Sequence, residues 1–250
     1  MNKTQYAAIA GMALALSSTA LTHDEKANEN SPWDGSNAQV GLTANSGNTQ
    51  TTDINTGLNV NYAKHKWKNV FNFTTQIQKN GGETSKEKYF AQNQTNFNFG
   101  DSYNQFIFLN ANTTMDKQSP YTYQIVGAAG YGLDLIDKEK FKWSIQAGPG
   151  FRTNKNRSTN TSEDKYATTA QTMLDWKMSK NVDLNEALNA IWGQPSNYYK
   201  SVTGFTNKIT GNIATSVSFT VEHYDKIPPG SKNTHKTDTT TAISIVYNFG

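Results

Sequence analysis

The chain has 250 residues, a formal net charge of +3 at pH 7 and no cysteine. The lack of thiols excludes disulfides, thiolate metal sites and cysteine nucleophiles. The near-neutral charge gives no reason to expect nucleic acid as a partner. At this length an all-β barrel usually forms a single domain.

The first residues have the layout of a secretory signal. Lys3 precedes an apolar run from Ala7 to Leu16, and small residues follow up to Ala20. We therefore predict a signal peptide at 1–20. The alternative, a membrane anchor, needs about 20 apolar residues in a helix, and this run is too short. Residues 21–36 are polar and without periodicity, and we interpret them as a flexible periplasmic lead-in.

From residue 37 to residue 249 the sequence alternates between apolar and polar residues, as β-strands do. The closing stretch "TDTTTAISIVYNFG" places Ile243, Ile245 and Tyr247 on one side and Ser244 and Asn248 on the other. We count twelve such runs, and single-chain bacterial outer-membrane barrels have an even number of strands. Two runs are irregular: in "NQFIFLNANTT" both faces are apolar, and in the ninth Glu186 falls on the apolar face, which we interpret as a β-bulge.

The connections between these runs alternate in length. Five are short, namely "AKHK", "GDSY", "IDKEK", "SKN" and "TGN", whereas most of the others are longer and polar, among them 153–164 and 225–237. Short periplasmic turns and longer outer loops are typical of an up-and-down membrane barrel. A soluble Greek-key sandwich has no reason to follow this alternation.

The expected number of strands decides which face is inside. A closed sheet of twelve strands is too wide for side chains to fill with a dry apolar core, so the polar face must line the interior and the apolar face must meet lipid. The predicted fold is all-β: a closed up-and-down antiparallel transmembrane β-barrel of about 12 strands over residues 37–249. The predicted location is the outer membrane of a Gram-negative bacterium.

Aromatic residues on the apolar face gather near the ends of the predicted strands, as membrane-interface anchors do. The candidates are Trp67, Trp143, Trp176, Tyr121, Trp192, Tyr247 and Phe249.

Charged residues on the polar face are the candidates for lining the lumen. They are Asp53, Lys88, Asp134, Lys142, Arg152, Lys165, Asp175, Asp183, Glu222 and Asp238. One interpretation is that their mixed charges set an ion preference. The other is that they pair across the lumen and close it. A glycine cluster beside them, Gly130, Gly132, Gly148 and Gly150, either widens the lumen or permits sharp curvature.

No set of residues points to chemistry. The four histidines, His23, His65, His223 and His235, have no recognisable serine partner, so we expect no enzyme activity. His223, Asp225, His235 and Asp238 bracket one outer loop, but such a set arises easily by chance, and we predict neither a metal nor a cofactor.

Four segments resemble a known family: "SGNT", "GYGLDLI", "AGPGFR" and the closing "YDKIPPGSKNTHKTDTTTAISIVYNF". Together they are similar to the YdiY-like family of salt-induced outer-membrane proteins, a domain of unknown function. The resemblance implies an outer-membrane location and a link to salt stress, and it implies no substrate or catalytic residue. In the general class of outer-membrane barrels the insertion machinery reads a terminal aromatic residue, here Phe249, although Gly250 follows it.

The sequence thus predicts a monomeric, non-enzymatic barrel that conducts small solutes or ions or serves the envelope under salt stress. The alternative is a surface-binding barrel whose outer loops contact a ligand, lipopolysaccharide or phage. The predicted partners are outer-membrane lipids, lipopolysaccharide and the barrel-insertion machinery, which would recognise the C-terminal strand.

Overall fold

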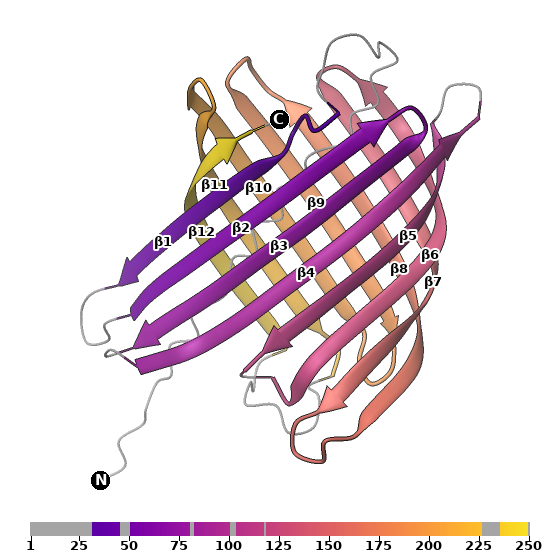
Figure 1. Cartoon of the computed structure of the whole chain (residues 1–250), viewed down its shortest axis with the longest axis vertical. Coiled ribbons are helices and arrows are strands. Elements are labelled where there is room, and N and C mark those ends of the chain that lie inside the picture. The colour runs from indigo at the N-terminus through magenta and orange to yellow at the C-terminus, as the bar shows by residue number, and fades with distance from the viewer. Residues whose placement is uncertain are drawn as a thin grey trace.

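The computed structural model describes residues 32–45, 51–80, 83–100, 104–117, 119–226 and 236–249, and the predicted signal peptide lies outside these ranges. The described residues form twelve antiparallel strands closed into a barrel (Figure 1). The strands are β1 (Asn37–Asn45), β2 (Thr51–Lys64), β3 (Trp67–Asn80), β4 (Glu83–Phe99), β5 (Gln105–Asp116), β6 (Tyr121–Lys138), β7 (Phe141–Asn156), β8 (Ser162–Lys177), β9 (Val182–Gly193), β10 (Tyr198–Thr210), β11 (Ile213–Tyr224) and β12 (Thr237–Asn248). Each strand pairs with the next, and β12 pairs with β1. The predicted fold class is confirmed.

No helix among the described residues is long and apolar enough to span a membrane.

The barrel wall has its apolar face outside. In β12, Ile243 and Ile245 are 62% and 63% exposed, whereas Ser244 between them is 5% exposed. The same order holds in β3 and β4, where Gln76 and Asn96 are buried and Phe71 and Phe73 are exposed. Such a wall is stable only if its apolar outer side chains contact hydrocarbon and its polar inner side chains find hydrogen-bonding partners.

The structure resolves the ambiguity in β5. Phe106 and Phe108 point inward and are buried, while Ile107 and Leu109 point outward. Phe106 fits inside because β6 carries a glycine beside it: a Cβ added to Gly132 would lie 2.2 Å from the Phe106 ring. At this position the missing side chain makes room for an aromatic ring, so it does not widen the lumen.

Gly130 and Gly148 support the curvature interpretation. A Cβ on Gly148 would lie 2.1 Å from the Ala129 carbonyl oxygen, and one on Gly130 would lie 2.2 Å from the Ala147 carbonyl oxygen. The backbones of β6 and β7 therefore approach more closely here than any side chain would allow. Glycine is needed because the neighbouring main chain occupies the space of a Cβ.

Register shifts in β6 change the orientation of one predicted residue. The pairing of β6 with β7 shifts between Tyr121 and Tyr123, so that Tyr121 lies opposite Asn156. Asn156 shares its parity with Asn154 and Arg152, which are buried inside the barrel. Tyr121 therefore belongs to the inward face, whereas the sequence pattern had placed it with the outward aromatics. A single extra residue in one strand has this effect.

The predicted outer loop at 153–164 is much shorter in the structure. β7 continues to Asn156 and β8 begins at Ser162, so the connection is 157–161. Arg157 at its start donates hydrogen bonds to the carbonyl oxygens of Ser119, Asp116 and Tyr121. One basic residue of this hairpin is thus engaged with the neighbouring connection.

The last part of the predicted lead-in packs against β2. Pro32 accepts a backbone hydrogen bond from Ala63, the Trp33 ring lies 4.9 Å from that of Tyr62, and Ser36 is buried. Residues 21–31 lie outside the described residues. Both ends of the barrel domain meet at the side of the short turns, where the Phe249 amide donates to the Ser36 carbonyl.

The seam between the first and last strands is short. β1 pairs with β12 from Asn37↔Asn248 to Gly41↔Ser244, which is five positions. The same strand pairs with β2 over nine positions, up to Asn45↔Thr51. Among the described residues, the outer half of β12 therefore has strand pairing with β11 but not with β1.

Candidate functional site: the charged lumen

Side chains from opposite walls meet inside the outer half of the barrel. Lys88 on β4 and Glu222 on β11 form a salt bridge with 3.8 Å between Nζ and Oε2. The Tyr198 hydroxyl on β10 donates to the same carboxylate. The ammonium of Lys200 lies 5.8 Å from the centre of the Phe90 ring on β4. Because β4 is not a neighbour of β10 or β11, these contacts cross the lumen.

A second set of cross-lumen contacts consists of amides. Gln94 on β4 and Gln146 on β7 exchange two hydrogen bonds of 3.0 and 3.1 Å, although two strands separate them in the sheet. Asn110 donates to Gln94, and Gln146 donates to Gln171 on β8. These amides satisfy one another in a buried setting, which favours a fixed arrangement.

The connection between β9 and β10 folds into the outer mouth. The buried guanidinium of Arg152 donates to the Ser196 carbonyl at 2.9 Å. Asp225, which follows β11, accepts hydrogen bonds from the Ser196 hydroxyl, the Asn197 amide and the Asn197 side chain. The bond from Ser196 and that from the Asn197 amide hold the pKa of Asp225 below its ordinary value, outweighing the opposite effect of partial burial.

The ten charged residues proposed for the lumen lie in two groups. Those toward the outer end are Asp53, Lys88, Arg152, Lys165, Glu222 and Asp238, and those toward the short turns are Asp134, Lys142, Asp175 and Asp183. Asp53, Arg152 and Glu222 are buried, and Lys165 is exposed. The structure brings Lys88 to Glu222 directly, whereas Lys142 pairs with Asp137 at 3.4 Å and Asp175 accepts from Asn185. Whether they line a conducting path stays a prediction.

Two inward lysines were missed in the sequence. Lys200 lies on β10, whose alternation is weak, and Lys68 on β3 shares its parity with the polar residues Asn72 and Thr74. Both are buried. The parity of β3 could have revealed Lys68, whereas nothing in the polar β10 segment distinguished Lys200.

The candidate interface aromatics other than Tyr121 are exposed on the barrel: Trp67, Trp143, Trp176, Trp192, Tyr247 and Phe249. Two of them donate along the outward face: Trp143 Nε1 to the Thr172 hydroxyl and Trp192 Nε1 to the Tyr199 hydroxyl. Their anchoring role stays a prediction.

Glu186 is on the outward face, and the predicted bulge is wrong. β9 pairs without a register shift, Leu174↔Glu186 on one side and Glu186↔Thr203 on the other. The carboxylate accepts hydrogen bonds from the hydroxyls of Ser201 and Thr203. These two donors, both from β10, satisfy the carboxylate among apolar neighbours. A carboxylate without hydrogen-bond partners in this setting would destabilise the fold.

The histidines do not build a reaction site within the described residues. His223 Nδ1 lies 2.8 Å from the Thr237 hydroxyl on the outward face, and His65 is in an exposed turn. Of the suggested metal set, Asp238 has the inward parity and Asp225 is engaged by Ser196, while His235 lies outside the described residues. The described residues contain no group of three or more potential metal ligands.

A closed antiparallel barrel with an even number of strands, an apolar outside and an ionisable interior defines the outer-membrane β-barrel class. The chain belongs to the family described as "Protein of unknown function, DUF481", which matches residues 38–249.

Solved structures of outer-membrane barrels share this fold. An outer membrane channel from Pseudomonas putida F1 is 13% identical, with a TM-score of 0.51, and the match covers 91% of this chain and 100% of the channel. The NanC porin is 6% identical, with a TM-score of 0.50, and the match covers 86% of this chain and 99% of the porin. No curated protein matches the sequence.

Proposed function

We propose that this protein is a narrow channel of the outer membrane that conducts small ions or polar solutes and catalyses no reaction. The observation that carries the proposal is the polar interior with ionisable side chains, among them Asp53, Arg152 and Glu222, inside a closed barrel wall that is apolar outside. Rings of ionisable side chains control ion passage in channels. The family resemblance adds the expectation that the channel serves the envelope under salt stress.

The cross-lumen contacts support a small conductance. The Lys88–Glu222 bridge and the Lys200–Phe90 contact narrow the outer half of the lumen, and the Gln94–Gln146 pair narrows the part nearer its middle. A path with these obstructions suits ions and water better than sugars or peptides. The mixed charges of the outer half give no basis for a strong preference between anions and cations.

Single-channel recording of the refolded protein in planar bilayers tests the proposal. We expect a small current from the wild type and a roughly severalfold larger one from the double variant Lys88→Gln/Glu222→Gln, because the bridge no longer holds two side chains across the lumen.

The matched control is Lys117→Gln/Glu87→Gln. This variant removes a shorter ion pair of 2.6 Å at the rim of the barrel, where Lys117 is largely exposed. Its conductance should equal that of the wild type. No current above baseline from either the wild type or the Lys88/Glu222 variant would refute the channel.

A further inference from the structure

The contacts that cross the lumen separate two sides of the interior. The hydrogen bonds, the ion pair and the ring contact described above start from β4 and reach β7, β11 and β10. On the side of β5 and β6, Phe106, Phe108 and Ala128 are buried together as an apolar cluster. On the other side, β11, β12, β1, β2 and β3 follow one another round the barrel. Polar residues on this second side are therefore the better candidates for contact with an ion.

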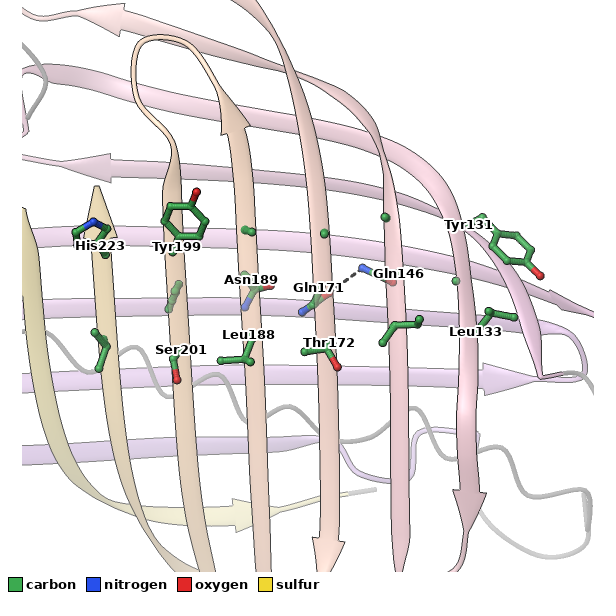
Figure 2. A pocket seen from close by; sticks show the side chains of 17 residues that line it. Tyr131, Leu133, Gln146, Gln171, Thr172, Leu188, Asn189, Tyr199, Ser201 and His223 are labelled. Atoms are coloured by element: carbon green, nitrogen blue, oxygen red, sulfur yellow. Dashed lines mark hydrogen bonds between the residues drawn. The ribbon is translucent and has the colours of Figure 1, made fainter. Parts of the chain in front are cut away.

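The central amides of the interior are paired with one another. Figure 2 shows Gln146 on β7 donating to Gln171 on β8, and Gln146 also exchanges hydrogen bonds with Gln94. The inner face of β2 and β3 differs, because it carries buried oxygen atoms for which the described part of the chain supplies no hydrogen-bond donor. These atoms are Asp53 Oδ1, Asn55 Oδ1, Thr74 Oγ1 and Gln76 Oε1. A buried acceptor without a donor is costly, so these oxygens indicate a place where a cation would be bound favourably.

The register places three of these residues next to one another. Asn55 lies directly opposite Gln76 in the pairing of β2 with β3, and Asp53 precedes Asn55 by two residues on the same face. Side chains directly opposite each other start about 5 Å apart, and successive ones on one face of a strand about 7 Å apart. The long Gln76 side chain covers such a gap, so a single ion is within reach of all three. Thr74, two residues from Gln76, extends the same row.

The charge of this group matches an ion with a single positive charge. Asp53 is 6% exposed, and no ion pair among the described residues neutralises its carboxylate. Lys88 lies opposite Gln76 on β4, but its ammonium is 3.8 Å from the Glu222 carboxylate across the lumen. The ligands other than Asp53 are neutral amide oxygens. One carboxylate with neutral oxygens suits a monovalent cation, whereas tight Ca²⁺ sites use several carboxylates.

We propose that Asp53, Asn55 and Gln76 bind a monovalent alkali cation, Na⁺ or K⁺, inside the barrel. Their oxygens would replace part of the hydration shell of the ion, as carbonyl oxygens do in selectivity filters. The inference deepens the proposed function and rests on it, because it names cations as the ions that pass. The mixed charges of the outer half do not select cations by themselves, so the preference would come from the acceptors of β2 and β3. Binding of the ion does not require a current and is measured separately.

The binding experiment compares the thermal unfolding midpoint of the refolded protein in NaCl, in KCl and in N-methylglucamine chloride at equal concentration, followed by a heat-dependent gel shift. An ion that binds only the folded state raises the midpoint. The wild type should unfold about 3 °C or more higher in the two alkali salts than in the organic salt. Asp53→Asn keeps the size of the side chain and removes its charge, and it should abolish this difference.

The matched control is Asp183→Asn, which removes the same charge from the inward face of β9, near the short turns. It should keep the difference of the wild type. Equal midpoints of the wild type in all three salts would overturn the proposal, as would an undiminished difference in Asp53→Asn. A rise that CaCl₂ alone produces would overturn the assignment to a monovalent ion.

Reversal potentials in a KCl gradient across a planar bilayer test the consequence for conduction. The wild type should pass K⁺ severalfold better than Cl⁻, and Asp53→Asn should lose most of this preference. A current that prefers Cl⁻ would overturn cation selection. Salt-dependent midpoints without any current would refute the channel and leave the binding site, whereas a current with equal midpoints would refute the site and leave the channel.

Discussion

Gly148 shows how a single position without a side chain shapes the wall. The atoms that a Cβ would meet there belong to the main chain of β6, the Ala129 carbonyl at 2.1 Å and the Gly130 Cα at 2.6 Å. Main chain fixed in a sheet cannot move aside as a flexible side chain can. The close approach of β6 and β7 therefore depends on this residue being glycine.

We expect Gly148→Ala to lower the free energy of unfolding by about 3 kcal/mol, at the upper end of the usual cost of overpacking. Equilibrium urea unfolding of the protein in lipid vesicles measures it. Gly204→Ala is the matched control, because nothing lies within 4 Å of the added Cβ. That substitution should leave stability unchanged or raise it by up to about 1 kcal/mol. Equal losses from both would contradict the close approach of the two strands.

The strands could be predicted from the sequence because one face of nearly every strand is apolar and the other polar. The orientation of β5 could not be predicted, because Phe106 and Ile107 are equally apolar. Only the space beside Gly132 determines that Phe106 is the one that points inward. Tyr121 was misplaced because one extra residue in β6 reverses parity without changing composition. The contacts across the lumen could not be predicted from the sequence, because Lys88 and Glu222 are far apart in the chain and meet only when the barrel closes.

We expect the position of the connection between β9 and β10 to depend on pH. The pKa of Asp225 is below its ordinary value, so its hydrogen bonds stabilise the connection above that value. As the pH falls through the lowered pKa, the carboxylate becomes protonated and this stabilisation is lost. Residues 194–197 should then become more mobile in acid.

Amide hydrogen exchange of Asn197, whose amide donates to Asp225, measured from pH 7 down to pH 3 and corrected for intrinsic rates, tests this expectation. The wild type should lose protection only at the acidic end of the range. Asp225→Asn should show low protection at every pH, because the neutral amide is a weaker acceptor. Protection that does not change with pH in the wild type would show that Asp225 does not hold this connection.

At the scale of the whole molecule, the two faces of the wall should tolerate charge differently. Val217 is 45% exposed on the outward face of β11, and Ser216 beside it points inward. In a bilayer, Val217→Arg should lower the free energy of unfolding by about 2–4 kcal/mol if the site lies near the midplane. Ser216→Arg should lower it by less, because its side chain enters a polar interior. Urea unfolding in vesicles provides the comparison, and equal costs would mean that this face does not meet lipid.

The short contact between β1 and β12 has a consequence for assembly. Every other neighbouring pair of strands lies close together in the chain, but this pair can meet only after the final strand has been made. With five paired positions it has fewer main-chain bonds to break than the other junctions. The cylinder should thus be sealed last along this line, and under heat or mechanical load it should split there first.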